Sequence, residues 1–106
     1  MSSEEPALGQ LVVSKLGRDK GRLFVIVRLV GGNYVYIADG STHRTADPKL
    51  KNVRHLILLE QVDQGIASRL KAGLAVADHQ IVTALRVYRP QTRREGMLID
   101  GQRGLR

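Results

Sequence analysis

The sequence predicts a small, mainly β fold: a compact sheet that closes into a barrel, followed by two short α-helices and a basic tail. Between residues 9 and 59, short β-branched runs are bounded by glycine turns, which is typical of strands. Beyond Glu60 the apolar residues follow a helical spacing. The length of 106 residues fits one domain, and a single Phe with no Trp leaves aliphatic side chains to fill a modest core.

The first two strands are expected on either side of a cationic turn. QLVVSK lies between Gly9 and Gly17, and RLFVIVRLV is long and β-branched, which favours a central strand. The pair Gly31-Gly32 then supplies the positive φ angles of a tight hairpin. These features predict the start of a meander.

The third expected strand, NYVYIA, alternates along its length. Val35 and Ile37 should face one side, and Tyr34 and Tyr36 the other. The segment 40–51 is interpreted as a loop because its residues are mixed and polar. NVRHLILL predicts a fourth strand, which could close the sheet and leave no long open edge.

Two short helices are expected after the sheet. In QVDQGIASRLKAG, Ile66 and Leu70 lie four positions apart, and Gly73 is placed as a C-terminal stop. A second helix can begin with Asp78 as its N-cap and run through HQIVTALRVYR until Pro90 ends it.

The chain divides into four stretches by composition. We expect a disordered leader (1–8), the barrel (9–59), a helical segment (60–88) and a flexible basic tail (89–106). The N-terminal MSSEEPA lacks the basic and apolar regions of an export signal, and no apolar run is long enough to span a bilayer. With no cysteine, disulfides and thiolate chemistry are excluded, and we expect a soluble, cytoplasmic protein.

The positive charge is distributed unevenly along the chain. The formal charge is +7 and the sequence pI is about 10.4, so a polyanion is the expected partner. Residues 9–59 contain nine Lys and Arg residues against three Asp, whereas residues 60–88 are neutral. Positive charge that served only solubility would be expected in the helical segment as well.

The cations of the barrel lie mainly in two connections, residues 17–22 (GRDKGR) and residues 44–51. Alternate loops of an up-and-down sheet emerge at the same end, so the two connections can form one basic patch. Lys and Arg there would neutralise phosphates, and glycine backbone can approach phosphate oxygens closely. The alternative is a glycine turn whose cations are merely solvated. The proposed phosphate contacts are Lys15, Arg18, Lys20, Arg22, Arg44, Lys49, Lys51 and Arg54, with close approach at Gly17 and Gly21.

The small number of aromatic residues limits the kind of RNA that this chain would bind. Proteins that bind single strands stack bases on several exposed rings, and the predicted sheet offers only Tyr34 and Tyr36. Structured RNA read by shape and backbone suits the composition better. Ordinary cross-strand packing is the favoured role for both tyrosines.

Part of the chain resembles a known motif. The segments Gly9-Gln10-Leu11-Val12-Val13 and Gly17-Arg18-Asp19-Lys20-Gly21-Arg22, with the apolar strand that follows, resemble the KOW motif, whose central glycine would be Gly21. The likeness continues through Tyr34–Ile37, Asp39-Gly40, Arg44, Pro48-Lys49, Lys51-Asn52 and His55-Leu56. Over about half of its length the chain thus looks like bacterial KOW-domain RNA-binding proteins related to the fourteen-e class of archaeal and eukaryotic large-subunit ribosomal proteins.

The resemblance implies an SH3-like barrel that binds ribosomal or other structured RNA. His55 joins the candidate RNA contacts, although a histidine in a strand also serves in packing or backbone hydrogen bonding. The arginine-rich tail departs from the pattern, so no family role is carried onto residues 89–106.

Other constellations do not indicate catalysis. The three histidines lack the spacing of a zinc site, and GRDKGR lacks the terminal Lys-Ser/Thr of a phosphate-binding P-loop. Asp39, Asp47, Ser41 and His43 formally supply acid, hydroxyl and imidazole, but such sets arise by chance in polar loops. We therefore expect no enzyme activity, no cofactor and no small-molecule substrate.

These inferences lead to one functional expectation and two rivals. The chain is expected to be a non-catalytic RNA-binding protein of the translation apparatus, ribosome-bound or assisting ribosome assembly. The alternative is a protein-interaction module that docks on RNA polymerase or a ribosomal protein, with the helices offering the apolar surface. Sequence-specific DNA binding is disfavoured because no helix presents base-reading Arg, Asn or Gln on one face.

Overall fold

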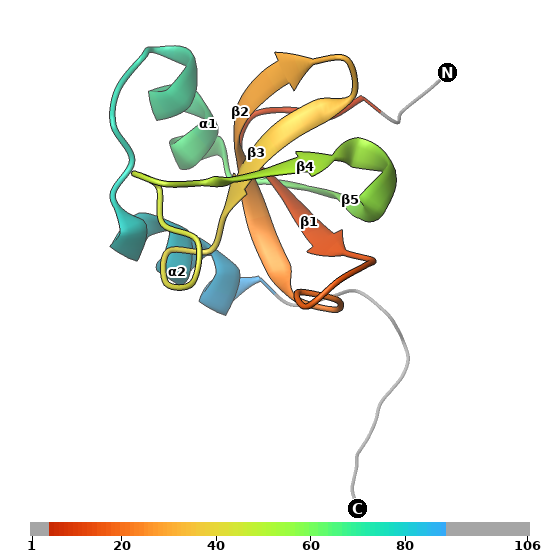
Figure 1. Ribbon diagram of the computed structural model, residues 1–106. Coiled ribbons are helices and arrows are strands. Elements are labelled where there is room, and N and C mark those ends of the chain that lie inside the picture. The colour runs from red at the N-terminus through yellow and green to blue at the C-terminus, as the bar shows by residue number, and fades with distance from the viewer. Residues whose placement is uncertain (1–4, 89–106) are drawn as a thin grey trace, which may run out of the picture.

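A five-stranded antiparallel sheet forms the framework of the protein (Figure 1). The computed structural model describes residues 5–88. The strand order is β4-β3-β2-β1-β5, so β4 and β5 are the two edges. The strands are β1 (Gln10–Ser14), β2 (Leu23–Gly31), β3 (Tyr34–Ala38), β4 (Lys49–Asn52) and β5 (Leu56–Val62). With two short helices after the sheet, the predicted mainly β class is confirmed.

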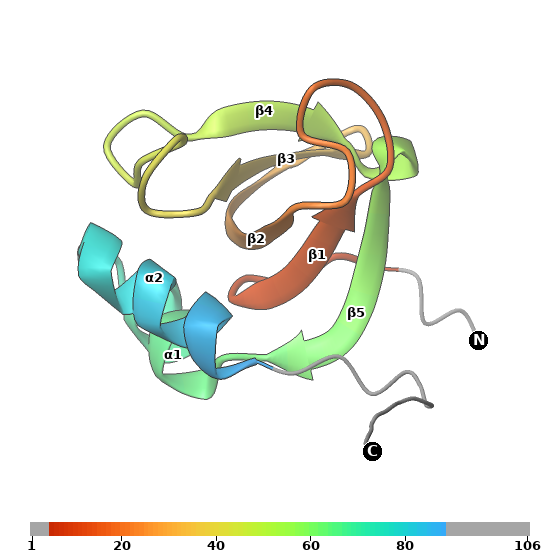
Figure 2. The ribbon, with the colours of Figure 1, turned by 90° about the horizontal axis from the view of Figure 1, so that it is seen from below.

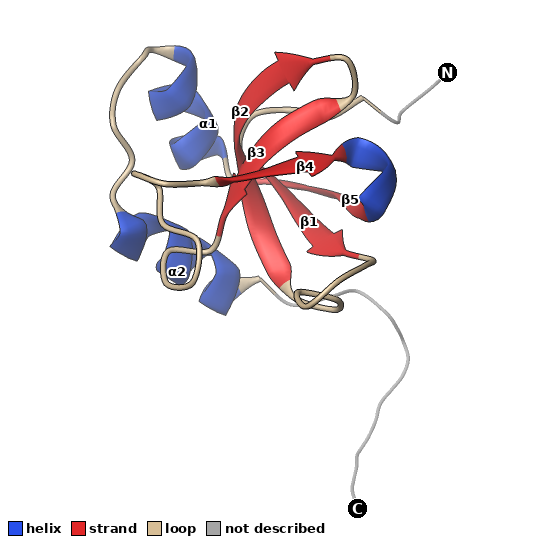
Figure 3. Ribbon diagram, viewed as in Figure 1, coloured by secondary structure: helices blue, strands red, loops and turns tan. Residues whose placement is uncertain are grey.

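The connection between β4 and β5 differs from the prediction. NVRHLILL was expected to be one strand, but Val53–His55 forms a 3₁₀ helix between two strands (Figure 3). Its first turn is capped by Asn52, whose side-chain oxygen accepts a hydrogen bond from the Arg54 amide at 2.9 Å. Strand β4 begins inside the segment 40–51 that was expected to be a loop and ends one residue beyond it, at Asn52. Within residues 5–88 no pairing joins β4 to β5, so the sheet is not closed by hydrogen bonds.

The β2–β3 hairpin turns one residue later than the glycine pair suggests. Gly31 still belongs to β2, and the turn is made by Gly32 and Asn33, whose φ angles are 63° and 70°. Two consecutive positive φ angles match the right-handed twist of the flanking strands. The Asn33 carbonyl also accepts a hydrogen bond from the Val53 amide at 2.7 Å, which ties this turn to the 3₁₀ helix.

The sheet curls around an inner apolar core. Phe24 and Ile26 of β2 meet Ile37 of β3, and all three side chains are fully buried. The alternation predicted for β3 is confirmed, because Val35 and Ile37 are buried while Tyr34 is 42% exposed. The inner core contains Val12, Phe24, Ile26, Val35, Ile37 and Leu56.

Two helices cover part of the outer face of the sheet (Figure 2). Helix α1 spans Gln64–Lys71 and α2 spans Asp78–Val87. Their buried side chains, Ile66 and Ile81, share a second core with outward-facing residues of β1 and β2. The second core contains Leu11, Val25, Ile66, Val76 and Ile81. Sheet and helices are therefore packed into one unit, and β5 continues to Val62, beyond the expected boundary at residue 59.

The helix ends follow local chemistry only in part. At the end of α1, Gly73 has a φ angle of 77°, and its amide donates to the Leu70 carbonyl at 3.1 Å, as predicted for a glycine stop. The expected N-cap of α2 is wrong, because the cap is Ala77 and Asp78 is the first helical residue. The Asp78 carboxylate instead accepts a hydrogen bond from the Thr45 amide at 2.7 Å, which holds the β3–β4 loop against α2.

The two chain ends extend beyond the described part. Residues 5–8 of the expected leader (1–8) belong to the described part, where the Ala7 amide donates to the Gln10 side chain at 3.0 Å. The expected tail (89–106), including the predicted stop at Pro90, lies outside the described residues. Within residues 5–88, neither helix has the length and apolar character needed to cross a membrane.

Candidate nucleic-acid interface

The β1–β2 loop (residues 15–22) folds into two successive turns. The Lys20 amide donates to the Gly17 carbonyl at 3.2 Å, and the Arg22 amide to the Asp19 carbonyl at 2.9 Å. Gly17 and Gly21 have φ angles of 82° and 85°, in the left-handed region that favours glycine. The two glycines therefore set the path of the loop and direct its charged side chains.

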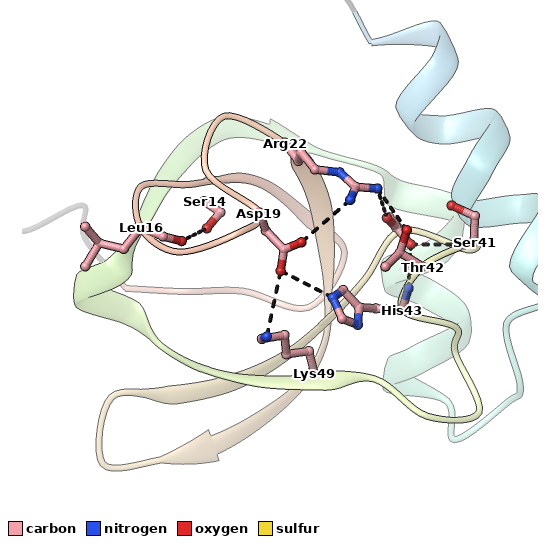
Figure 4. Close-up of polar contacts among 9 residues, drawn as sticks. Ser14, Leu16, Asp19, Arg22, Ser41, Thr42, His43 and Lys49 are labelled. Atoms are coloured by element: carbon pink, nitrogen blue, oxygen red, sulfur yellow. Dashed lines mark hydrogen bonds and ion pairs between the residues drawn. The ribbon is translucent and has the colours of Figure 1, made fainter.

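A buried carboxylate lies at the centre of the cations. The Asp19 residue is only 6% exposed, yet its oxygens face three basic side chains from three segments (Figure 4). Its Oδ2 lies 3.3 Å from His43 Nε2 and 3.8 Å from Lys49 Nζ, and its Oδ1 lies 3.6 Å from the Arg22 guanidinium. One acid thus links the β1–β2 loop to the β3–β4 loop (residues 39–48) and to β4.

Arg22 makes a second connection between the same loops. Its guanidinium donates to Asp39 Oδ2 at 2.9 Å and to Thr42 Oγ1 at 3.0 Å. The other oxygen of Asp39 accepts from the Ser41 and His43 amides, which shapes the turn. The predicted convergence of the two cationic connections at one end of the sheet is therefore confirmed.

Strand β4 contributes two lysines to this end of the sheet. Lys49 and Lys51 share a face of β4, and each is partly buried. Lys51 Nζ lies 4.0 Å from the place where a Cβ atom on Gly17 would stand, so it approaches the β1–β2 loop. The Lys15 amide donates to the His55 carbonyl at 2.8 Å, which places the 3₁₀ helix beside the start of that loop.

We define the basic surface by the cations of the β1–β2 loop and β4. Arg18 and Lys20 are exposed and make no ion pair within the described residues, so both are available to an external anion. Arg44 and Arg54 are exposed as well, but no ion pair or side-chain hydrogen bond within residues 5–88 connects them to the other cations. The basic surface comprises Lys15, Arg18, Lys20, Arg22, Lys49 and Lys51.

At this site the acidic side chains are buried and the basic side chains are more exposed. Asp19 and Asp39 are 6% and 7% exposed, whereas the side chain of Arg22 is 45% exposed. The two buried acids contact Arg22 and Lys49, whose side chains remain partly exposed. The arrangement therefore presents positive charge to solvent at positions fixed by contacts among the loops.

The polar residues of the β3–β4 loop contact the β1–β2 loop and the backbone of their own turn. The His43 ring faces Asp19, and Asp39 binds backbone amides and Arg22. The phenyl ring of Phe24 lies beside His43, with 5.8 Å between ring centroids. Within the described part of the chain, no group of three or more His, Cys, Asp or Glu residues could hold a metal ion.

The sequence-based interpretation missed the acids. Neither Asp19 nor Asp39 was expected to orient the basic side chains, but the two acids contact Arg22, His43 and Lys49. The available signal was a single acid inside GRDKGR and an Asp-Gly turn after a buried strand.

The chain was compared with protein family models and with curated proteins. No protein family model matches the chain, and no curated protein matches it.

Proposed function

We propose that this protein is a non-catalytic RNA-binding protein of the translation apparatus, built on an SH3-like barrel of the KOW type. The barrel is supported by five antiparallel strands curled around one inner core, with a 3₁₀ helix between the last two. The observation that carries the RNA proposal is the contact of Asp19 with Arg22, His43 and Lys49, which come from three segments.

Preorganised cations favour a phosphate ligand over a diffuse counterion cloud. Binding is strengthened when side chains are already held in place, because less conformational freedom is lost. Each phosphate neutralised by Lys or Arg also releases condensed counterions, which adds a favourable, salt-dependent contribution. Arg22 and Lys49 contact buried acids, while the exposed Arg18 and Lys20 make no ion pair within residues 5–88. A charged RNA backbone matches this arrangement.

The salt dependence of binding tests the proposal. If six cations contact phosphates, the affinity for a hairpin RNA should fall by a factor on the order of 10³ between about 50 and 200 mM salt. Filter binding over this range measures the slope. An affinity that hardly changes with salt would remove the electrostatic basis of the proposal.

A matched pair of variants locates the contact surface. Arg18→Gln with Lys20→Gln removes two exposed cations without touching the Asp19 contacts, and should lower the salt slope by about 2. Arg69→Gln with Lys71→Gln removes the same charge from α1, which lies far from the β1–β2 loop in both views (Figures 1 and 2). Equal effects of the two pairs would indicate diffuse attraction rather than a defined surface.

A protein-interaction module remains the second candidate because the helices form an apolar groove. The groove has a volume of about 570 Å³ and runs between α1 and α2, where Val87 is 71% exposed. Its apolar lining includes Leu11, Ile66, Ala84 and Tyr88. Affinity capture from nuclease-treated lysate separates the two functions, because ribosomal partners that persist without RNA favour the protein-docking candidate.

A further inference from the structure

One part of the outer sheet face is not covered by the helices. Tyr36 of β3 pairs with Arg28 of β2 and with Leu50 of β4, so these three side chains share a face. Tyr34 shares it too, because it lies two residues before Tyr36 in the same strand. The fractional exposures of Tyr34 and Leu50 are 42% and 47%. We define Arg28, Tyr34, Tyr36 and Leu50 as the aromatic face.

Arg28 gives this face a positive charge. Three cations of residues 9–59 lie outside the two cationic connections. Lys15 and Arg54 flank these connections, whereas Arg28 lies within β2, away from both. Its guanidinium lies over the Tyr36 ring, 6.0 Å from the ring centroid. Arg28 also lines a recess of about 460 Å³ together with Pro48 and Leu74. The face therefore combines aromatic rings, a planar cation and an adjoining hollow.

Strand β4 joins the aromatic face to the basic surface. Successive side chains of a strand point to opposite faces, so Lys49 and Lys51 belong to the basic surface and Leu50 to the aromatic face. β4 is an edge strand of four residues, and only β3 pairs with it within residues 5–88. A polyanion bound along the two lysines can therefore reach around this narrow edge.

We propose that the aromatic face stacks an unpaired nucleobase of the RNA whose phosphates contact the basic surface. Every base has a π-face that stacks on tyrosine without sequence preference, and an arginine plane stacks in the same way. The ligand class is thus helical RNA interrupted by a bulged or looped-out nucleotide. This inference rests on the proposed RNA-binding function and specifies its substrate.

Three RNA hairpins of equal length test the stacking. One carries a bulged 2-aminopurine, the second an abasic bulge, and the third no bulge. The bulged base should bind about 5-fold or more tightly than the abasic site, the lower end of the range for base–aromatic stacking. The 2-aminopurine fluorescence should fall on binding, because stacking quenches it. This second readout needs no protein variant.

Two variants assign the effect to the aromatic face. Tyr34→Leu and Tyr36→Leu keep apolar volume but remove the ring, and should abolish the preference for the bulged base while leaving the salt slope unchanged. The control is Tyr88→Leu, because Tyr88 packs against the second core rather than on this face.

The possible outcomes separate this inference from the function on which it depends. Salt-dependent binding of equal strength to all three hairpins, without quenching, overturns the stacking and leaves RNA binding intact. Absence of binding to every hairpin overturns both. If the tyrosine variants lose a protein partner but bind all hairpins like the unaltered chain, the face is a protein-docking surface and the inference is wrong.

Discussion

At the scale of single residues, Asp19 links one cation of the β1–β2 loop, Arg22, to side chains of the β3–β4 loop and β4. Its ion pair with Arg22 spans 3.6 Å and involves a guanidinium that is 45% exposed, so the pair itself stabilises the fold little. The larger consequence is geometric, because one buried carboxylate fixes His43 and Lys49 from other segments beside the loop. The fold itself therefore holds these basic side chains together at one end of the sheet.

Two glycines with the same backbone conformation are expected to respond differently to substitution. Gly9 and Gly21 have φ angles of 81° and 85°. A Cβ atom at Gly9 would lie 2.8 Å from Ala67 Cβ and 2.9 Å from the Asp63 carbonyl oxygen, whereas nothing lies within 4 Å at Gly21. Gly21→Ala should reduce the free energy of unfolding by about 1 kcal/mol through backbone strain alone. Gly9→Ala should reduce it by about 2 kcal/mol more, because α1 must shift.

Urea unfolding followed by circular dichroism measures both values. The difference between the two variants isolates the close approach of β1 to α1, since the backbone strain is common to both. Equal losses of stability would contradict the packing of α1 against Gly9.

At the scale of secondary-structure elements, the sequence predicts what depends on local chemistry. The alternation of β3 and the glycine stop at Gly73 are visible in neighbouring residues, and both are confirmed. Strand β4 was missed because its sequence, KLKN, places lysines toward the β1–β2 loop and Leu50 outward, without an apolar inner row. Asp78 was misassigned because its partner, the Thr45 amide, lies 33 positions away in the sequence.

The helices are expected to unfold together with the sheet. Ile81 of α2 is fully buried in the second core beside Val25 of β2. Ile81→Ala should lower the free energy of unfolding by about 2–5 kcal/mol, and hydrogen exchange should accelerate in β2 as well as in α2. Val87→Ala serves as the control, because Val87 is 71% exposed and its loss should change stability by less than about 0.5 kcal/mol. Exchange that accelerates in α2 alone would indicate an independent helical segment.

At the scale of the whole molecule, topology made part of the interface predictable. Alternate loops of a meander lie at one end of the sheet, and this rule alone brings residues 17–22 and 44–51 together. The single acid in GRDKGR and the Asp-Gly turn mark the two acids in the sequence, but their ion-pair partners depend on tertiary distances that the sequence does not show. Arg44 and Arg54 were included in the predicted basic patch because of their charge. No contact within residues 5–88 links them to the basic surface, so charge alone did not identify its members.

The concentration of exposed cations should also reduce the stability of the protein when no anion is bound. Like charges repel over a Debye length of about 30 Å at 0.01 M salt and about 8 Å at 0.15 M. The carboxylates of Asp19 and Asp39 are buried, so their ion pairs are screened less than charges that are exposed on both sides. Arg18→Gln with Lys20→Gln should therefore raise the free energy of unfolding at 0.01 M salt, by about 0.5 kcal/mol. The gain should disappear at about 0.5 M salt, where exposed charges are screened.

The matched pair Arg69→Gln with Lys71→Gln lies in the neutral helical segment and should give no such gain. Urea midpoints at both salt concentrations measure the effect. A loss of stability on removing Arg18 and Lys20 would mean that these cations stabilise the folded loop and do not repel their neighbours.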